Sequence, residues 1–318
     1  MKSILFILSV IFCDGIFLGQ TARNVSQGKG GIVYFSYDNG ESWENNSNGL
    51  PKDIFLSDLA ASDEFLGLAT KQNGIFLYNV EKRSWVKTNG TPKTSNDFDA
   101  LYLFKSRMFV GTQGEGVFIS SDKGQNWFAL NDGLSNLTVR KFTEIDNKLY
   151  VGTNGGLFSF DEHENKWHFE YGNNNLQVNG IIEYDNEIYI GTNQGAYKAN
   201  INKSNMKKIL PDKSLHNIGV ARNIVYALVY NELFATKDKG MTWYSDQKGM
   251  PKGKYSFQII QKDNTVLVGQ WDGIYKKDAT ENWKLTSKGL PNNTPILEFK
   301  TYKGFIVAGS SLWTDNSK

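Results

Sequence analysis

The chain has 318 residues, of which 40% are hydrophobic and 14% aromatic, and it carries 35 basic and 33 acidic side chains. A net charge of +2 over this length excludes a polybasic surface for nucleic acid and an acidic tail, so any partner has to be recognised by local features. The 31 glycines and 6 prolines, beside abundant Phe and Tyr, are typical of a β-rich globular protein with many tight turns.

Residues 1–19 have the pattern of a secretory signal peptide. Lys2 precedes an apolar run from Ile4 to Phe12, which is shorter than the roughly 20 residues of a membrane-spanning helix. Cleavage near Gly19 would remove Cys13, the only cysteine, and with it any disulfide or thiolate metal site. We therefore expect export to the periplasm, the medium or the cell surface, with residues 20–29 as a short linker and one folded domain over 30–318.

The most informative feature of the sequence is a repeat of about 40 residues. It is marked by six regularly spaced tryptophans, at 43, 85, 127, 167, 243 and 283. Between them recur a Gly-Leu-Pro or Gly-Leu-Ser turn, two apolar runs separated by a polar turn, a Gly-Thr pair, and a third run. The phrases 110–118, 151–158 and 190–197 show this succession most clearly.

Each repeat predicts four short antiparallel strands, because β-branched and aromatic runs alternate with Gly, Asn and Asp. In the repeat that follows Trp43, we place the strands at 54–61, 64–70, 74–80 and 84–88. Such a unit cannot bury both faces alone, and packing several units around an axis solves this problem. First strands near 54, 98, 137, 178, 215, 255 and 295 predict an all-β, seven-bladed β-propeller.

The two ends of the chain are expected to share the last blade. The segment from Gly31 to Trp43 supplies a third and a fourth strand without a first or second, and the seventh repeat lacks its outer strands. Pairing of the N- and C-terminal strands would close the ring and remove exposed sheet edges. Leu312-Trp313-Thr314 also resembles a third strand, but we expect the N-terminal segment to occupy this place.

Three of the turns before tryptophan follow the pattern Ser/Thr-x-Asp-x-Gly-x-x-Trp, and degenerate copies end at Trp167 and Trp283. The pattern resembles the Asp-box, or bacterial neuraminidase repeat, of sialidase-like and sortilin-like propellers, and the linking phrases resemble propeller repeats of two-component sensors. The residues that carry the resemblance are Ser36, Asp38, Gly40 and Trp43; Ser120, Asp122, Gly124 and Trp127; and Thr236, Asp238, Gly240 and Trp243.

We expect these residues to be structural. A short carboxylate can accept hydrogen bonds from its own turn, glycine supplies a positive φ, and tryptophan packs between sheets. The three aspartates recur at blade-sized separations, so they cannot converge on one metal ion or substrate. The resemblance implies that these turns lie on the face opposite the ligand-binding mouth.

Candidate ligand-binding residues therefore come from the loops that surround the mouth, namely those joining second to third strands and each fourth strand to the next blade. Trp271 stands outside the tryptophan repeat, and an exposed ring beside polar groups can stack on a sugar or a peptide. The alternative is a ring packed over a neighbouring loop. The candidates are Trp271, Asp272, Gln270, Tyr255, Asp97, Gln113, Glu115, Asn154, Asn193 and His216.

A sialidase is not expected, because its mechanism needs an arginine cluster for the substrate carboxylate. Of the five arginines only Arg140 falls on a first strand. Another glycosidase or a lyase needs only two carboxylates at the mouth, which Asp53, Asp97, Glu115 and Asp272 could supply. The three histidines lack a metal-binding context, so neither a metal nor a cofactor is expected, and His168 and His216 are placed near the mouth.

The sequence thus favours an exported, monomeric, non-catalytic scaffold that recognises a glycan, a peptide or a partner protein at the mouth. It predicts no nucleic-acid partner and no membrane span. A carbohydrate-active enzyme with two mouth carboxylates is the first alternative. An assembly factor like the photosystem-assembly propellers is the second, although the basic patch of that group has no counterpart in this sequence.

Overall fold

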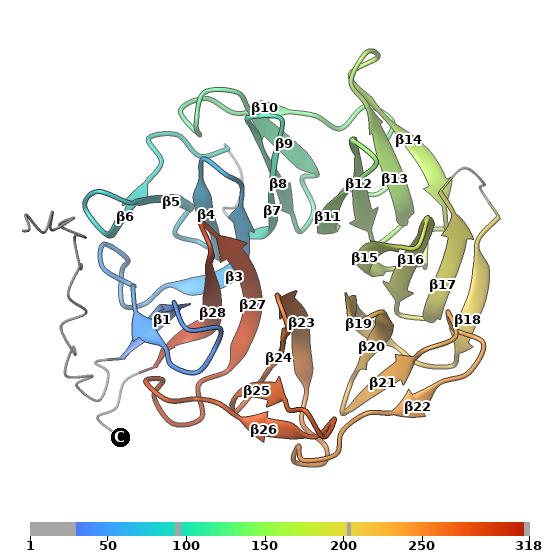
Figure 1. Ribbon diagram of the computed structural model, residues 1–318. Helices are drawn as coiled ribbons and strands as arrows, with labels where there is room; N and C mark the ends of the chain where they lie inside the picture. Colours follow the sequence, from blue (N-terminus) through green and yellow to red (C-terminus); the bar gives the residue numbers. More distant parts are fainter. Residues whose placement is uncertain (1–29, 93–96, 202–204, 315–318) are drawn as a thin grey trace, which may run out of the picture.

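The computed structural model describes residues 30–92, 97–201 and 205–314. Over these residues the chain forms seven four-stranded antiparallel sheets arranged as blades around one axis (Figure 1). No helix occurs in the described ranges. The predicted seven-bladed propeller is therefore confirmed.

The strands of the first four blades follow one another along the chain. Blade 1 consists of β3 (Phe55–Ala61), β4 (Leu66–Lys71), β5 (Ile75–Asn79) and β6 (Ser84–Lys87). Blade 2 consists of β7 (Phe98–Phe104), β8 (Arg107–Thr112), β9 (Val117–Ser120) and β10 (Phe128–Ala129). Blade 3 consists of β11 (Val139–Ile145), β12 (Lys148–Thr153), β13 (Gly156–Asp161) and β14 (Lys166–Tyr171). Blade 4 consists of β15 (Val178–Tyr184), β16 (Glu187–Thr192), β17 (Gly195–Asn200) and β18 (Lys207–Pro211).

The remaining blades complete the ring. Blade 5 consists of β19 (Leu215–Ala221), β20 (Ile224–Val229), β21 (Glu232–Thr236) and β22 (Tyr244–Ser245). Blade 6 consists of β23 (Ser256–Lys262), β24 (Thr265–Gln270), β25 (Gly273–Lys277) and β26 (Trp283–Leu285). Blade 7 consists of β27 (Ile296–Tyr302), β28 (Phe305–Thr314), β1 (Gly31–Ser36) and β2 (Glu44–Asn45).

Blade 7 closes the ring by joining the two ends of the chain. Strand β1 pairs antiparallel with β28, placing Tyr34 opposite Ala308, and Figure 1 shows the first strand beside the last. The predicted closure is therefore confirmed. Residues 312–314 continue the backbone of β28 past a register shift, and Thr314 lies opposite Gly31. They lengthen the second strand and do not compete for the place of the third.

The hydrophobic core is divided into layers between adjacent blades. One cluster, for example, joins Phe35 and Val307 of blade 7 to Leu68 and Trp85 of blade 1. Equivalent clusters fill the other six joints. This division follows from the repeat, because each sheet has two apolar faces and buries both only between two neighbours.

The repeated tryptophan fastens the loop that enters its own blade. In blade 1, the indole Nε1 of Trp85 donates to the Asn46 carbonyl at 2.8 Å, and its backbone N–H donates to the Asn48 carbonyl at 2.8 Å. Gly49 follows with φ +88°, and a Cβ there would lie 2.2 Å from the Trp85 carbonyl oxygen. Gly289, Gly133 and Gly249 approach the carbonyl oxygens of Trp43, Trp167 and Trp283 in the same way, so close approach of the two backbones explains the glycine of these turns.

The turns that carry the Ser/Thr-x-Asp-x-Gly pattern are closed by their own side chains. In blade 7, Asp38 Oδ1 accepts from Ser36 Oγ at 2.8 Å and from the Ser42 amide at 2.9 Å, and Ser36 Oγ accepts from the Gly40 amide at 2.7 Å. The turns at Asp122 and Asp238 repeat these bonds. Hydrogen bonds to the charged form lower the pKa of both of these aspartates to about 2.

Candidate functional site

A β-bulge occurs at the same place in the first strand of every blade. The register between first and second strands shifts by one residue just inside the mouth end of β3, β7, β11, β15, β19, β23 and β27. A bulge turns an additional side chain away from the regular alternation. The first strands contact one another around the axis, so the bulges act together on the mouth of the central channel.

Two sets of seven side chains result. We call the residues inside the register shift the bulge ring: Ser57, Asp99, Arg140, Asn179, His216, Phe257 and Leu297. We call the residues that follow them the channel ring: Asp58, Ala100, Lys141, Gly180, Asn217, Gln258 and Glu298. Only His216 and Arg140 of the two rings were discussed from the sequence.

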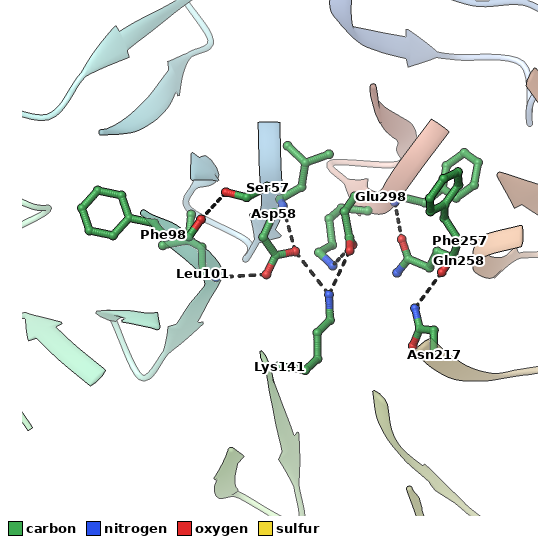
Figure 2. Close-up of polar contacts among 12 residues, drawn as sticks. Ser57, Asp58, Phe98, Leu101, Lys141, Asn217, Phe257, Gln258 and Glu298 are labelled. Carbon is green, nitrogen blue, oxygen red and sulfur yellow. Dashed lines mark hydrogen bonds and ion pairs between the residues drawn. The ribbon is translucent and has the colours of Figure 1, made fainter. Parts of the chain in front are cut away.

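Many of these side chains fasten one blade to the next. In the bulge ring, Asn179 Nδ2 donates to the Leu215 carbonyl at 2.8 Å, and Ser57 and His216 contact the equivalent carbonyls of Phe98 and Ser256. In the channel ring, Asn217 Nδ2 donates to the Phe257 carbonyl at 2.9 Å. Figure 2 shows two of these side-chain-to-carbonyl latches, that of Ser57 between blades 1 and 2 and that of Asn217 between blades 5 and 6. It also shows Gln258, whose side-chain oxygen accepts from the Phe299 amide between blades 6 and 7. The side-chain-to-carbonyl latches join side chain to backbone across the joints between blades 1 and 2, blades 4 and 5, and blades 5 and 6.

The channel ring also carries a charged bridge, which we define as Lys141, Asp58 and Glu298. Lys141 Nζ lies 3.3 Å from Asp58 Oδ1 and 3.1 Å from Glu298 Oε1, so blade 3 is joined to blades 1 and 7 across the axis (Figure 2). The side chains are 19%, 4% and 12% exposed, respectively. Asp58 is further held by the amides of Leu59 and Leu101, both at 2.9 Å.

Burial and charge act against each other in this bridge. Burial opposes the charged form of Lys141, but the two carboxylates outweigh it and raise the pKa of the ammonium group. Burial, with Asp58 nearby, raises the pKa of Glu298 although Lys141 and Lys300 favour its charged form. Asp58 and Glu298 are thus two converging carboxylates that the sequence analysis did not name. Both bind Lys141, so this arrangement holds blades 1, 3 and 7 together.

Above the bridge, the mouth carries an aromatic shelf made by Tyr230, His216, Tyr255, Phe257 and Trp271. The His216 and Tyr255 rings stack with centroids 3.8 Å apart. Tyr230 meets Tyr255 edge-on at 5.4 Å, Phe257 lies 4.7 Å from Tyr255, and Trp271 meets Phe257 edge-on at 5.0 Å. Tyr230 is 68% exposed and Trp271 is 47% exposed. The rings therefore form one connected, partly solvent-facing surface over blades 5 and 6.

Polar groups lie within the shelf and beside it. Burial lowers the pKa of His216 from 6.5 to about 4, although the Ser256 carbonyl favours the charged form, so the imidazole is neutral at pH 7. Gln270 lies fully buried under the shelf and donates to Ser256 Oγ at 2.8 Å. Asp272 Oδ2 accepts from the Tyr275 hydroxyl at 3.1 Å.

Gln270 marks a difference between blade 6 and the first four blades. In those blades a threonine stands at the end of the second strand or one residue before it, and its hydroxyl closes the following turn. Thr153 Oγ1, for example, donates to the Gly156 carbonyl at 3.1 Å. Gln270 cannot make this bond, and the turn after it carries Trp271 outward. Its Oε1 is buried, and no hydrogen-bond partner is present for it within the described ranges.

The other candidates form a charged group at blades 1 to 3. Asp97 pairs with Lys71 through a backbone bridge, and Lys71 Nζ lies 3.9 Å from Asp99 Oδ1. Arg140 Nε donates to Asn154 Oδ1 at 2.7 Å. Burial raises the pKa of Asp99, although a hydrogen bond from Gln113 and the charges of Lys71 and Arg140 favour ionisation.

The two remaining predicted residues lie in loops of blades 2 and 4. Glu115 lies in the turn after Thr112, whose hydroxyl accepts from the Glu115 amide at 2.9 Å. Asn193 fixes the neighbouring loop of blade 4, where Nδ2 donates to the Asn175 carbonyl at 3.1 Å. The structure thus divides the ten candidates between an aromatic side, a charged side and two loop residues.

The expected position of His168 near the mouth is wrong. His168 pairs with Ser159 beside the hairpin that joins β13 to β14, and its Nε2 lies 3.0 Å from Glu164 Oε2. This hairpin is on the face opposite the mouth, because β14 begins at the hairpin and reaches the mouth only at its C-terminal end. Asp161 completes a group of three potential metal ligands with them, all at least partly exposed.

Tyr230 and Phe257 were not among the sequence candidates, although Tyr230 stood in a mouth turn. A signal for Phe257 was present, because it occupies the bulge position of a first strand, where blades 1 to 5 have Ser57, Asp99, Arg140, Asn179 and His216 and blade 7 has Leu297. Only alignment of the repeats at the bulge would have revealed this position.

Comparison with known proteins shows the fold and no family. No family model and no curated protein matches the sequence. The extracellular domain of BT4673 from B. thetaiotaomicron, described as a one-component system, superimposes with a TM-score of 0.68 at 16% identity, over 91% of this chain and 39% of that one. The extracellular domain of BT3049 from the same organism, described as a hybrid two-component system, superimposes with a TM-score of 0.66 at 17% identity, over 84% of this chain and 40% of that one.

A third solved structure, YCF48 bound to D1 peptide, has a TM-score of 0.64 at 12% identity and covers 85% of this chain and 95% of that one. This chain spans about two fifths of the length of the two B. thetaiotaomicron chains. At these identities the similarity establishes the propeller fold alone. The described part of the chain contains no helix that is long and apolar enough to cross a membrane.

Proposed function

We propose that this chain is a non-catalytic binding scaffold that holds its ligand on the aromatic shelf at the channel mouth. Of the classes considered, a glycan fits this surface best. Exposed rings offer flat apolar faces to sugar rings, while carboxylate and amide groups beside them bind hydroxyls. The observation that carries the proposal is the connection of Tyr230, Tyr255, Phe257 and Trp271 into one partly exposed surface.

The charged side of the mouth supports the same ligand class. Asp99, Gln113, Arg140 and Asn154 provide both donors and acceptors there, as a hydroxyl-rich ligand requires. The sequence candidates on both sides belong to this proposal, which gives the shelf the stacking role and the charged side the hydrogen-bonding role. The charged bridge below limits the ligand to the mouth, because Lys141 crosses the channel.

A peptide or a partner protein is the second candidate. A structural neighbour is YCF48 bound to D1 peptide, and aromatic-lined grooves also receive extended peptides. This includes the assembly-factor alternative. The shelf would then contact apolar or proline side chains, and the polar groups would bind the peptide backbone.

A carbohydrate-active enzyme is the third candidate, and the glycan test described below can also reveal it. Asp53, Asp97, Glu115 and Asp272 come from three blades, and hydrolysis would require two carboxyl groups about 5 to 10 Å apart on either side of a sugar bond. Hydrolysis of a bound glycan would favour this alternative over a scaffold.

Export, the monomeric state and membership of the Asp-box group also belong to the proposal. The N-terminal 1–19 pattern supports export, and two structural neighbours are extracellular domains. The hydrogen-bonded turns at Asp38, Asp122 and Asp238 support the group membership. These residues were named as structural, and their bonds within their own turns agree with that role.

The test is a glycan array and a peptide array probed with the purified chain, then repeated with Trp271→Ala and with Tyr244→Ala. Tyr244 is a matched control, because it is 39% exposed on the outer strand of blade 5. We expect glycan binding that Trp271→Ala removes and Tyr244→Ala leaves intact. Binding to peptides and not to glycans would make a peptide the ligand. Equal loss of binding in Trp271→Ala and Tyr244→Ala would show that the mouth is not the binding site.

A further inference from the structure

On the face opposite the mouth, polar contacts close the joints between neighbouring blades. In four joints, the hairpin between first and second strands of one blade contacts the turn between third and fourth strands of the next. Arg107 binds Glu162 at 2.6 Å between blades 2 and 3, and Arg222 binds Glu281 at 3.0 Å between blades 5 and 6. Asp185 and Lys239 join blades 4 and 5, and Lys262 and Asn39 join blades 6 and 7.

The joint between blades 1 and 2 differs, because it contains a cavity of about 200 Å³. The residues that line it are Ser62, Asp63, Glu64, Phe65, Leu77, Leu103, Lys105, Ser106, Met108 and Lys123. Asp63 and Glu64 have no ion pair with any described residue. Charges suitable for the usual contact are present on both sides, but space separates them.

Lys123 contacts the hairpin that carries Asp63 and Glu64 through an aromatic ring and makes no ion pair with either carboxylate. Its Nζ lies over the Phe65 ring, 5.0 Å from the centroid. The backbone of Glu64 is fixed on the blade 1 wall of the cavity, because its carbonyl accepts a hydrogen bond from the Tyr302 hydroxyl at 3.4 Å. A cation over an aromatic face gains about 0.5 to 1 kcal/mol at an exposed site. Both walls are thus positioned without contact between their charges.

The two walls have opposite charge and the floor is apolar. Blade 1 contributes the carboxylates of Asp63 and Glu64. Blade 2 contributes Lys123 and also Lys105, which shares the single carboxylate of Glu162 with Arg107. The floor consists of Leu77, Leu103 and the buried Met108.

We propose that this cavity binds a small zwitterion with an apolar body, namely a free α-amino acid with a side chain of about the size of leucine or methionine. The ammonium group would bind Asp63 and Glu64, the carboxylate would bind Lys123, and the side chain would cover the apolar floor. The volume is below the roughly 300 Å³ of sites for larger ligands. Charge complementarity on two walls selects a molecule with both charges over a simple amine or acid.

The proposal is independent of the mouth, since no residue is shared between the shelf and the cavity. The bound amino acid would add charged contacts between blades 1 and 2 beside the contact of Lys123 with the Phe65 ring. It would therefore stabilise the folded chain in proportion to its occupancy.

The test is a titration of the full chain with L-leucine and, separately, with L-methionine, followed by calorimetry and by thermal unfolding. Isoamylamine and 4-methylpentanoate serve as probes that keep the apolar body and one charge. We expect saturable binding of leucine with a higher unfolding temperature, and at least tenfold weaker binding of each singly charged probe. Equal binding of all three, or no binding of leucine and methionine, would overturn the proposal.

Two variants separate the cavity from other surfaces. Asp63→Asn with Glu64→Gln keeps the size of the hairpin side chains and should weaken leucine binding at least tenfold. Glu232→Gln, in blade 5, is a control that should leave binding unchanged. Asp63 and Glu64 are exposed, so the hairpin variant should fold. If it binds leucine as well as the wild type does, the proposed site is wrong.

Discussion

The charged bridge and the aromatic shelf lie one above the other at the same channel, yet they use their side chains in opposite ways. Lys141, Asp58 and Glu298 are largely buried and bind one another across three blades. Tyr230 and Trp271 keep about half or more of their surface in solvent. Side chains that different blades contribute to the same channel mouth therefore divide cohesion from recognition, and this division can be tested by comparing stability with binding.

The largest effect on stability is expected from Lys141→Met. Removal of the ammonium group leaves two buried carboxylates facing each other, and breaking a buried ion pair costs about 3 to 5 kcal/mol. Urea unfolding at pH 7 should show a loss of about 3 kcal/mol. Adding Glu298→Gln should recover part of it, because one of the two uncompensated charges is removed.

Lys300→Met is the matched control, since Lys300 is 25% exposed and lies 3.5 Å from Glu298. A loss below 1 kcal/mol is expected for it. If Lys141→Met were as mild as this control, the bridge would not contribute the cohesion that distinguishes it from the shelf.

The loop that leads to Tyr255 offers a second contrast, between two glycines four positions apart. Gly249 has φ +94°, and a Cβ there would lie 2.1 Å from the Trp283 carbonyl oxygen, whereas Gly253 has φ +72° and open space. Gly253→Ala should cost about 1 kcal/mol for its backbone conformation. Gly249→Ala should cost about 2 kcal/mol more, because the backbones must separate. Equal unfolding free energies of the two variants would exclude the close packing of this loop on Trp283.

The third contrast is the pH dependence that His216 brings to the shelf. Its pKa is lowered from 6.5 to about 4, so the unfolded chain binds the proton more readily than the folded chain. This contribution to stability is complete above pH 6.5 and is lost as the pH falls towards 4. Because the side chain is partly exposed, we expect the unfolding free energy to fall by about 2 kcal/mol over this range, which is less than the whole pKa shift would give.

His216→Asn removes the titration and copies the latch that Asn179 makes in blade 4. The difference in unfolding free energy between wild type and His216→Asn should therefore decrease from pH 7 to pH 4 when measured by denaturant titration. A difference that is constant with pH would show that His216 titrates normally and is not desolvated by Tyr255.

The repeat made the fold predictable from the sequence, while the site was only partly predictable. The tryptophan spacing, the turns and the split final blade indicated seven blades and their closure before any coordinates. Trp271, Tyr255 and His216 were named as candidates because the repeat places them in or next to the loops of the mouth. Their contact with one another depends on the separation of blades 5 and 6, which a sequence does not contain.

The bulges explain most of the residues that were missed. An additional residue in a first strand changes which side chains face the channel, so Phe257, Asp99 and Lys141 could not be placed from strict alternation. The convergence of Asp58 and Glu298 on Lys141 links residues 83 and 157 positions apart in the chain. Charge pattern alone gives no indication of such a pairing.

The most direct test of the proposed recognition at the mouth is the affinity of wild type and Trp271→Ala for one array-selected glycan, measured by calorimetry at pH 7. Loss of a stacking ring at the centre of a binding surface should weaken the affinity at least tenfold. The unfolding free energy should change by less than 1 kcal/mol, since the ring is 47% exposed. An unchanged affinity, with Tyr244→Ala also unchanged, would contradict the assignment of the shelf as the binding surface.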